Sequence, residues 1–251
     1  VILTGIEAAS YGKDIGGYPL WRLMREAAAV EGIERVRTGS LEPSVLTNRF
    51  CDEIAAEPRI MPSFHLSLQS GSSAVLAAMK RRYNREQVLK NTAYLRKAIP
   101  NVTFTCDIIV GFPGETEEDF NELCEYIAQT EFDRLGAFTY SREEDTPAYD
   151  FENQIDEQTK QDRYDIIMRE QLHIAERKNQ AFVGKRMTVL CEAYDSVAEI
   201  YYGRSAYDAP DIDTKVYFRN ALGKKRIAPG AFVEVDIEEA VDYDLIGRAV
   251  V

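Results

Sequence analysis

Cysteine and histidine, the residues that most often bind metals, are scarce in this sequence. Among its 251 residues are four cysteines and two histidines. The cysteines are 55, 18 and 67 positions apart, at Cys51, Cys106, Cys124 and Cys191. No CxxC or CxxxCxxC motif is therefore present to hold zinc or an iron–sulfur cluster by local spacing. We expect the cysteines to be buried small hydrophobic residues, and we predict no metal ligands in this chain.

Long apolar segments and several enzyme signatures are also missing. No run of 18 apolar residues exists to span a bilayer, and no basic segment precedes an apolar stretch at the start. The sequence has no Walker loop, GxGxxG motif or Ser-His-Asp order, so phosphotransferase, Rossmann and serine hydrolase functions lack support. These absences predict a cytoplasmic protein with no membrane partner. Because the chain begins at Val1 inside an expected strand, we also expect a preceding portion to be missing.

Acidic residues outnumber basic ones by 42 to 30, which gives a formal net charge of −12 at pH 7. A field of this sign repels the phosphates of nucleic acids. Binding of nucleic acid through delocalised positive charge is therefore disfavoured, although a local basic patch stays open. With 45% hydrophobic and 29% charged residues, the composition is otherwise that of an ordinary globular protein.

The first two-thirds of the chain alternates β-rich runs with helical segments. Strands are expected at Val1–Ile6, Arg35–Thr38, Phe64–Leu68, Thr103–Val110 and Leu135–Tyr140. Helices are expected between them, at Trp21–Val30, Ser44–Ala56, Ser73–Lys80, Arg85–Ala98 and Glu117–Gln129. Strands separated by helices of this length predict βα units and a parallel sheet, either doubly wound or an incomplete barrel.

The remaining third has a different pattern. A long polar helix is expected over Asp156–Gln180, and five short alternating runs without a helix follow it: Met187–Ala193, Ile200–Ser205, Lys215–Arg219, Phe232–Ala240 and Tyr243–Val250. We therefore expect two domains, residues 1–180 and 181–251. The second is predicted to be a small five-stranded antiparallel β-barrel.

The strongest local motif joins a buried strand to a Gly-Pro-Gly turn and a capped helix. It contains Gly111, Phe112, Pro113, Gly114 and Glu115. Parallel α/β folds bind ligands at the carboxyl ends of their strands, and glycine permits a close approach of the backbone. The edge of an adenine could therefore hydrogen-bond to this turn. The alternative is a tight βα turn whose glycines only satisfy geometry.

A second motif, QSGS at 69–72, also follows an expected strand. Its side chains and amides suit a carboxylate or ribose hydroxyls, and the alternative is that it caps the next helix. Two carboxylates, Glu7 and Glu42, also lie just past strand ends, with solvated loop residues as the alternative. His65 lies within a strand and His173 on a helix, without neighbours at ligand spacing, so we expect structural roles for both.

Taken together, these blocks resemble the radical S-adenosylmethionine (SAM) methylthiotransferases. The resemblance covers essentially the whole chain and implies an incomplete (β/α)6 radical SAM barrel followed by a TRAM domain. It is carried by LTGIEAASYG (Leu3–Gly12), GSLEP (Gly39–Pro43), HLSLQSGS (His65–Ser72), MKRRYNRE (Met79–Glu86), DIIVGFPGETEEDF (Asp107–Phe120), FTYSREEDTPAYD (Phe138–Asp150), NQAFVGK (Asn179–Lys185) and YYGRSAYDAPDID (Tyr201–Asp213).

The resemblance implies a transferase that uses SAM and two [4Fe-4S] clusters. In the family, one cluster, reduced by an electron donor, cleaves SAM to a radical that removes a substrate hydrogen, and the second cluster delivers the methylsulfanyl group. The resemblance assigns no catalytic residue in this chain. It does assign contacts with SAM, to Gly111, Phe112, Pro113, Gly114 and Glu115 at the adenine, to Glu42, Gln69 and Ser70 around the ribose and methionine, and to Tyr140 at the barrel end.

One departure from the family pattern concerns the clusters. The CxxxCxxC motif, the first barrel strand and the cluster domain of the family have no counterpart in this sequence. We therefore expect the chain to be a fragment that is inactive by itself.

The expected substrate depends on the branch of the family. LTGIEAASYGKD, RVRTGSLEP and FHLSLQSGS resemble the branch that modifies threonylcarbamoyl-adenosine beside the tRNA anticodon. TPAYD, NQAFVGK and YYGRSAYDAPDID instead resemble the branch that modifies an aspartate of the twelfth small-subunit ribosomal protein. Residues 181–251 contain nine Lys and Arg against twelve Asp and Glu, a net charge of −3, which suits a basic ribosomal protein.

We therefore predict the ribosomal protein as the substrate, with tRNA as the alternative. The protein would be recruited through acidic loop residues, namely Asp208, Asp211 and Asp213. A tRNA would instead be held through Lys224, Lys225 and Arg226.

Overall fold

The computed structural model describes residues 1–210, 213–221 and 226–250. The chain divides into two compact units, Val1–Gln171 and Leu172–Val251. The long helix α6 (Glu157–Gln180) begins in the first unit and ends in the second. The expected domain boundary, after residue 180, lies at the end of this helix, whereas the two units divide within it. None of the helices in the described part of the chain has the length and apolar character that a membrane span needs.

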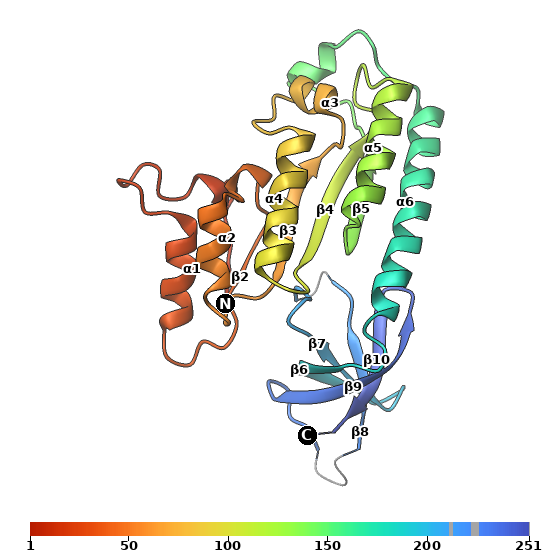
Figure 1. Ribbon diagram of the computed structural model, residues 1–251. Helices are drawn as coiled ribbons and strands as arrows, with labels where there is room; N and C mark the ends of the chain where they lie inside the picture. Colours follow the sequence, from red (N-terminus) through yellow and green to blue (C-terminus); the bar gives the residue numbers. More distant parts are fainter. Residues whose placement is uncertain (211–212, 222–225, 251) are drawn as a thin grey trace. The chain divides into compact units, whose positions relative to one another are not determined.

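The first unit is built on parallel strands that follow one another in chain order (Figure 1). They are β1 (Ile2–Leu3), β2 (Arg37–Thr38), β3 (Ser63–Gln69), β4 (Thr103–Val110) and β5 (Arg134–Thr139). β1 pairs with β2, and β3, β4 and β5 form one sheet. A parallel bridge from Leu41 to Leu66 joins the two sheets. A doubly wound sheet would reverse its strand order at a switch point, so the continuous order confirms the incomplete barrel.

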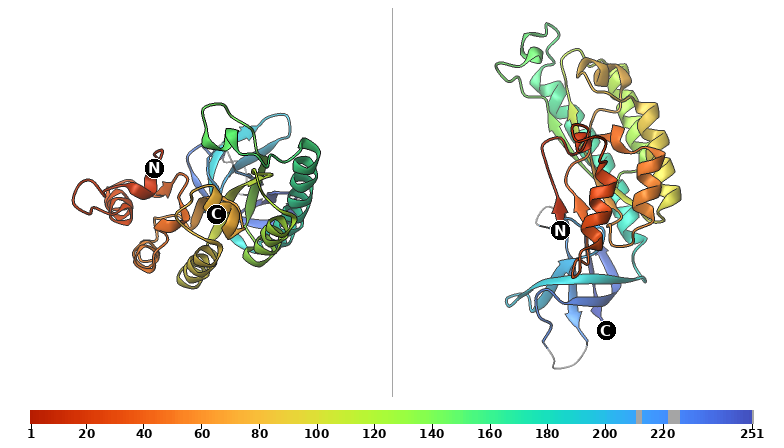
Figure 2. Two further views of the ribbon diagram at one scale, coloured as in Figure 1. Left: turned by 90° about the horizontal axis from the view of Figure 1, so that it is seen from above. Right: turned by 90° about the vertical axis from the view of Figure 1, so that its left-hand side faces the viewer.

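Helices connect these strands and lie along one side of the sheet (Figures 1 and 2). Right-handed crossovers between consecutive parallel strands place every helix on the same face. The helices are α1 (Leu20–Ala29), α2 (Asn48–Ala55), α3 (Ser73–Ala78), α4 (Arg85–Ala98) and α5 (Glu117–Thr130). α2 begins later than predicted because Thr47 caps it, accepting a hydrogen bond from the Phe50 N–H at 3.2 Å.

The strands of this sheet present two different faces. The face toward the helices is fully apolar and contains the buried side chains of Phe64, Leu66, Leu68, Phe104, Cys106, Ile108, Val110, Leu135 and Ala137. The opposite face is more polar and more accessible. We call it the helix-free face, and it consists of His65, Ser67, Gln69, Thr105, Asp107, Ile109, Gly136 and Phe138.

The second unit contains a closed barrel of five strands. They are β6 (Arg186–Asp195), β7 (Ile200–Arg204), β8 (Val216–Asn220), β9 (Phe232–Val241) and β10 (Asp244–Ala249), in the closed order β10-β8-β7-β6-β9. Its core includes Val189, Phe218 and Val235, each buried. Four strand pairs are antiparallel, as predicted, but β8 and β10 pair in parallel. Directions cannot alternate around a ring with an odd number of strands, so one parallel pair is unavoidable.

Two of the aspartates predicted to recruit a partner serve the fold of the second unit. Asp208 is 4% exposed, and its Oδ2 accepts hydrogen bonds from the Ser205 N–H at 2.9 Å and the Ser205 hydroxyl at 2.6 Å. Asp213 Oδ2 accepts the Ala209 N–H at 2.6 Å. These carboxylates hold a turn together. The prediction that Asp208 recruits a partner is wrong, because its side chain is buried.

The other predicted docking residues are only partly described. Asp211, Lys224 and Lys225 lie outside the described residues. Arg226 is exposed, and its guanidinium lies 6.0 Å from the centre of the Tyr194 ring. Of the three cations predicted to bind a tRNA, Arg226 is therefore the one that the structure describes, and it is exposed.

Candidate functional site

The carboxyl ends of β3, β4 and β5 surround a pocket of about 470 Å³ on the helix-free face. Its lining consists of Gln69, Asp107, Ile109, Phe138, Thr139, Tyr140, Ser141, Glu143, Thr146 and Ala148. Ligands of parallel α/β folds bind at this edge of the sheet, where the strand-end motifs predicted a site. Two of the predicted ligand-binding residues, Gln69 and Tyr140, line the pocket.

Gln69 has an unusual backbone conformation. Its φ is 71°, in the left-handed region that non-glycine residues seldom adopt. The register of β3 against β4 shifts between Leu66 and Gln69, just before this residue. Backbone strain of this kind concentrates at functional sites, which supports a ligand-binding role for Gln69.

The Gly111–Glu115 turn is held by a buried carboxylate. Glu115 Oε1 accepts the Gly111 N–H at 2.9 Å and the Arg163 Nη1 at 2.6 Å. Burial raises the pKa of Glu115, while the Gly111 hydrogen bond and the Arg163 charge act in the opposite direction. Pro113 is buried and Gly114 is exposed. The carboxylate thus stabilises the turn from within, and any ligand would meet the backbone of the turn.

Tyr140 links this turn to the pocket. Its ring packs edge-on against Phe112 with centroids 5.4 Å apart, and its N–H donates to the Val110 carbonyl at 2.9 Å. The ammonium group of Lys160 donates to the Tyr140 carbonyl at 3.0 Å. The Tyr140 hydroxyl is buried without a hydrogen-bond partner among the described residues, so a bound ligand could satisfy it.

Two predicted residues stand near this edge without lining the pocket. Ser70 is 1% exposed, and its hydroxyl oxygen accepts the Ser72 N–H at 3.2 Å. Glu42 is half-buried after β2, and its Oε1 accepts the Ser44 hydroxyl at 3.1 Å. Neither side chain is brought to Gln69 and Tyr140 in this structure.

The helix-capping alternative for the QSGS motif is confirmed at Ser72. Its hydroxyl oxygen accepts the Val75 N–H at the start of α3 and donates to Asp119 Oδ1 at 2.6 Å. Gln69 faces the pocket while Ser72 caps the helix. Within this motif, helix capping is thus confirmed for Ser72, and ligand binding stays a prediction for Gln69.

A polar group on the helix-free face was missed in the sequence analysis. His65 Nε2 lies 3.2 Å from Asp107 Oδ2, and His65 Nδ1 lies 2.8 Å from Thr105 Oγ1. The Asp107 side chain is 42% exposed and lines the pocket. The available signal was the single charged residue of an otherwise uncharged strand. Its partner was not evident because the two residues are 42 positions apart.

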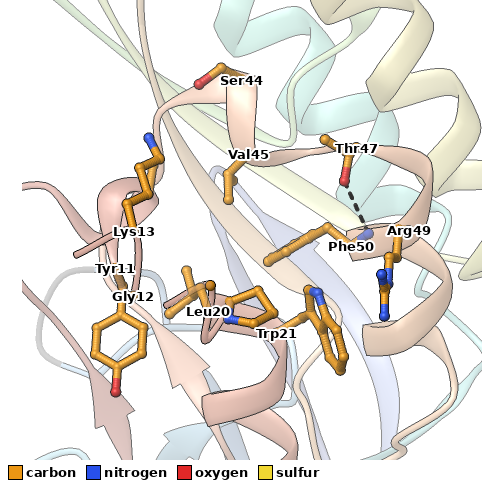
Figure 3. A pocket seen from close by; sticks show the side chains of 13 residues that line it. Tyr11, Gly12, Lys13, Leu20, Trp21, Ser44, Val45, Thr47, Arg49 and Phe50 are labelled. Carbon is orange, nitrogen blue, oxygen red and sulfur yellow. Dashed lines mark hydrogen bonds between the residues drawn. The ribbon is translucent and has the colours of Figure 1, made fainter. Parts of the chain in front are cut away.

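A second cavity of about 300 Å³ lies in the first unit between the loop after β1, α1 and the start of α2 (Figure 3). Trp21, Leu20 and Phe50 contribute apolar walls. The guanidinium of Arg49 lies 5.2 Å from the centre of the Trp21 ring, and Lys13 stands at the other side of the cavity. None of the predicted ligand-binding residues line it.

The cysteines behave as the sequence predicts. Cys51, Cys106 and Cys191 are buried and Cys124 is half-buried, all as free thiols. Burial raises the pKa of Cys51 and of Cys124 to about 11, which disfavours the thiolate that binds metal. In the part of the chain that the structure describes, no three Cys, His, Asp or Glu side chains form a group that could hold a metal ion. The described residues therefore do not fit an iron–sulfur cluster.

The chain matches two known sequence families. The profile of the radical SAM superfamily matches residues 1–127, and that of the TRAM domain matches residues 183–250. A solved structure of coproporphyrinogen III oxidase (HemN) from Escherichia coli, described as a radical SAM enzyme, superimposes with a TM-score of 0.45 at 19% identity. It covers 64% of this chain and 36% of that one.

Curated relatives match along the whole chain. Ribosomal protein uS12 methylthiotransferase RimO of Acetivibrio thermocellus is 39% identical over 251 residues, which is 100% of this chain and 55% of that protein. RimO of Geobacter sulfurreducens is 37% identical over 250 residues, which is 99% of this chain and 55% of its own length. The chain thus spans about half the length of the curated relatives it matches.

Proposed function

The chain belongs to the radical SAM superfamily, and from this premise we propose that it forms the SAM-binding portion and the TRAM domain of an enzyme that adds a methylsulfanyl group to an aspartate of ribosomal protein uS12. One observation carries the proposal: identity of 39% to a uS12 methylthiotransferase extends over all 251 residues. The match therefore spans both units and extends beyond residues 1–127, which the superfamily profile matches.

The pocket supports SAM binding by this chain. Gln69 offers an amide, Tyr140 offers a buried hydroxyl that has no partner among the described residues, and Ile109 offers an apolar surface. The backbone of the Gly111–Glu115 turn adjoins Tyr140 through Phe112 and would bind the adenine edge. Glu42 does not line this pocket, and its contact with the amino group of the methionine part stays a prediction from the family resemblance, since a carboxylate complements an ammonium ion.

The proposed chemistry needs groups beyond the residues described. An iron–sulfur cluster would supply the electron for the cleavage of SAM, and a second cluster would supply the methylsulfanyl group, but the described residues do not fit a cluster. Because the described residues offer no cluster site, we propose that the cluster ligands belong to a segment outside this sequence. The chain alone would then bind SAM and substrate without turning over, and an external electron donor would serve the whole enzyme.

A tRNA substrate is the competing proposal, as in the related branch that modifies threonylcarbamoyl-adenosine. The feature that favours it is the likeness of the blocks LTGIEAASYGKD, RVRTGSLEP and FHLSLQSGS to that branch. The excess of acidic residues in 181–251 counts against it. Affinity for a nucleic acid comes largely from Lys and Arg side chains that bind phosphates and release the counterions condensed on them.

The proposal is tested by restoring a complete enzyme. The part of Acetivibrio thermocellus RimO that precedes its match to this chain is fused to Val1, and the fusion is expressed in a bacterium that lacks its own RimO. We expect mass spectrometry to find uS12 carrying an added methylsulfanyl group. A fusion with Gln69→Asn, which tolerates a left-handed backbone but is one methylene shorter, should modify less uS12. Unmodified uS12 together with newly methylthiolated tRNA would establish the competing function.

A further inference from the structure

We propose that the cavity between the loop after β1, α1 and the start of α2 binds a nucleotide that has a phosphate on each side of its ribose. Such a nucleotide is either one unit of a single-stranded RNA or a free nucleoside bisphosphate. The cavity has a volume of about 300 Å³, the size of a small-ligand pocket. None of the predicted contacts with SAM lines it. The site therefore goes beyond the proposed function and does not depend on which substrate is modified.

The cavity concentrates positive charge in an acidic chain. Its lining includes Lys13 and Arg49 and contains no Asp, Glu or His. Within the described ranges, neither of these cations forms an ion pair or a side-chain hydrogen bond. Glu42 accepts the hydroxyl of the lining residue Ser44 at 3.1 Å, but does not itself line the cavity. Because the net charge of the chain is −12, two unpaired cations at one cavity form a local site for an anion.

The two cations lie on either side of an apolar wall. Figure 3 shows Lys13 at one side of the cavity and Arg49 at the other, with Leu20, Trp21 and Phe50 between them. Leu20 and Phe50 are buried and Trp21 is half-buried. A nucleotide within a chain has the matching order, since its flat base and its ribose lie between two phosphates. The arrangement therefore favours a ligand with two phosphates over a single small anion.

Arg49 is held by an aromatic ring and not by a carboxylate. Its guanidinium lies 5.2 Å from the centre of the Trp21 ring. Thr47 caps α2 and accepts the Phe50 N–H at 3.2 Å, which fixes the start of the helix that carries Arg49. A guanidinium that stacks on a ring keeps its N–H donors in a planar fork, the geometry that binds phosphate oxygens. Aromatic rings also provide surfaces on which bases stack.

The loop that carries Lys13 has a closed shape. The N–H groups of Gly17 and Tyr18 donate to the Gly12 carbonyl at 3.1 and 3.3 Å. Gly12 has a φ of +76°, and a Cβ atom there would lie 1.6 Å from the Tyr18 carbonyl oxygen. Only glycine permits this close approach. Lys13 is thus presented from a loop that is already folded, which lowers the entropy cost of binding a ligand.

Trp21 makes the site directly observable, because it is the single tryptophan of the sequence and lines the cavity. The experiment titrates the chain with uridine 3′,5′-bisphosphate and follows the fluorescence of Trp21. We expect a saturable change. Uridine, which has no phosphate, should bind at least about tenfold more weakly, the effect of losing one charge-assisted hydrogen bond. Uracil is used because SAM contains adenine, and saturating SAM should not displace the bisphosphate.

Charge variants test the two phosphate contacts. Lys13→Gln and Arg49→Gln should each weaken binding of the bisphosphate about tenfold. With a short oligouridylate, each should also reduce the log–log salt dependence by about 0.7, the value for one phosphate contact on a single strand. Val45→Phe keeps every charge, fills part of the cavity and should also weaken binding. The matched control is Lys90→Gln, which removes an exposed cation of α4 and should leave the affinity unchanged. Circular dichroism verifies that each variant is folded.

The outcomes identify the source of the nucleotide or overturn the inference. Tighter binding of the oligouridylate than of the free bisphosphate assigns the site to RNA, and equal or weaker binding assigns it to a free nucleotide. The inference is overturned if uridine or inorganic phosphate binds as tightly as the bisphosphate, or if Lys13→Gln and Arg49→Gln bind like Lys90→Gln. Displacement of the bisphosphate by hexaglutamate at equal concentration would identify an acidic protein segment as the occupant instead.

These failures are distinguishable from failure of the proposed function. The titrations with nucleotides contain neither SAM nor uS12, so a negative result there leaves the proposed methylthiolation of uS12 standing. Displacement of the bisphosphate by SAM would place SAM in this cavity, and would overturn both the inference and the proposed SAM pocket.

Discussion

At the scale of single residues, Gly111 shows how a tight turn depends on the space around it. Its φ is +73°, and a Cβ atom there would lie 2.3 Å from Lys160 Cγ on α6. Gly114 has a similar φ of +85°, but no atom lies within 4 Å of its would-be Cβ. Both glycines therefore have a left-handed backbone, which a side chain would strain. Of the two, Gly111 also lacks the space for a Cβ atom.

Alanine at these two positions should therefore have different costs. We expect Gly114→Ala to lower the free energy of unfolding by about 1 kcal/mol, the cost of a left-handed non-glycine residue. Gly111→Ala should lower it by about 2–4 kcal/mol, because the clash with Lys160 adds overpacking to the same strain. Urea denaturation of both variants measures the difference. Equal losses would show that Lys160 moves aside without cost.

The residues of the site were predicted unevenly from the sequence, for a physical reason. Gln69 was predicted from its strand-end motif and Tyr140 from the family resemblance, and both line the pocket. Their role in binding stays a prediction. Asp107 and His65 were missed because their contact depends on the register of β3 against β4, and a sequence does not state which residues of two distant strands lie opposite. Glu115 was predicted to contact a ligand, yet its closest described partners are Arg163 and Gly111. Whether it also contacts SAM stays a prediction.

At the scale of elements, the start of α5 ties two βα units together. Thr116 and Asp119 form a capping box, as Thr116 accepts the Asp119 N–H at 3.1 Å and Asp119 accepts the Thr116 N–H at 3.0 Å. Asp119 Oδ1 also accepts the Ser72 hydroxyl at 2.6 Å. Burial would raise the pKa of Asp119, but the hydrogen bonds from Ser72 and Thr116 outweigh burial and lower it below 3.8.

Asp119→Asn should therefore destabilise the chain in a pH-dependent way. A lowered pKa means that the stabilisation is complete above the unfolded-state value of 3.8 and is lost as the pH falls through the folded-state value. We expect a loss of about 1–2 kcal/mol at neutral pH, shrinking toward zero in acid. Urea denaturation across this pH range measures it, with exposed Glu122→Gln as the control. A difference independent of pH would contradict the role of the charge.

The elements were largely predictable because their signals are local. Every expected strand of the first unit has an observed counterpart, and Thr116 caps α5 as its sequence indicates. β1 and β2 are only two residues long, shorter than expected, because alternation of residues does not show how far a partner strand extends. The parallel pair β8–β10 follows from closing five strands into a ring, a property of the whole barrel that no single strand encodes.

At the scale of the whole molecule, the four cysteines lie on four different helices and strands. Cys51 lies on α2, Cys106 on β4, Cys124 on α5 and Cys191 on β6, and all four belong to the described residues. A [4Fe-4S] cluster needs several thiolates around one centre. Burial raises the pKa of each of these thiols, so both their placement and their protonation oppose ligation.

The purified chain, incubated with iron and sulfide under reducing anaerobic conditions, should therefore take up no stoichiometric cluster. Visible absorption and iron analysis after gel filtration measure the uptake, with a [4Fe-4S] ferredoxin treated in parallel as the positive control. In the same sample, binding of SAM measured by calorimetry should persist, since the proposed contacts of Gln69, Tyr140 and the Gly111–Glu115 turn do not depend on iron. One cluster per chain would show that the cysteines rearrange, and the assignment of the ligands to a segment outside this sequence would fall. If the chain takes up no cluster and also fails to bind SAM, then the cluster, and not this pocket, provides most of the affinity for SAM.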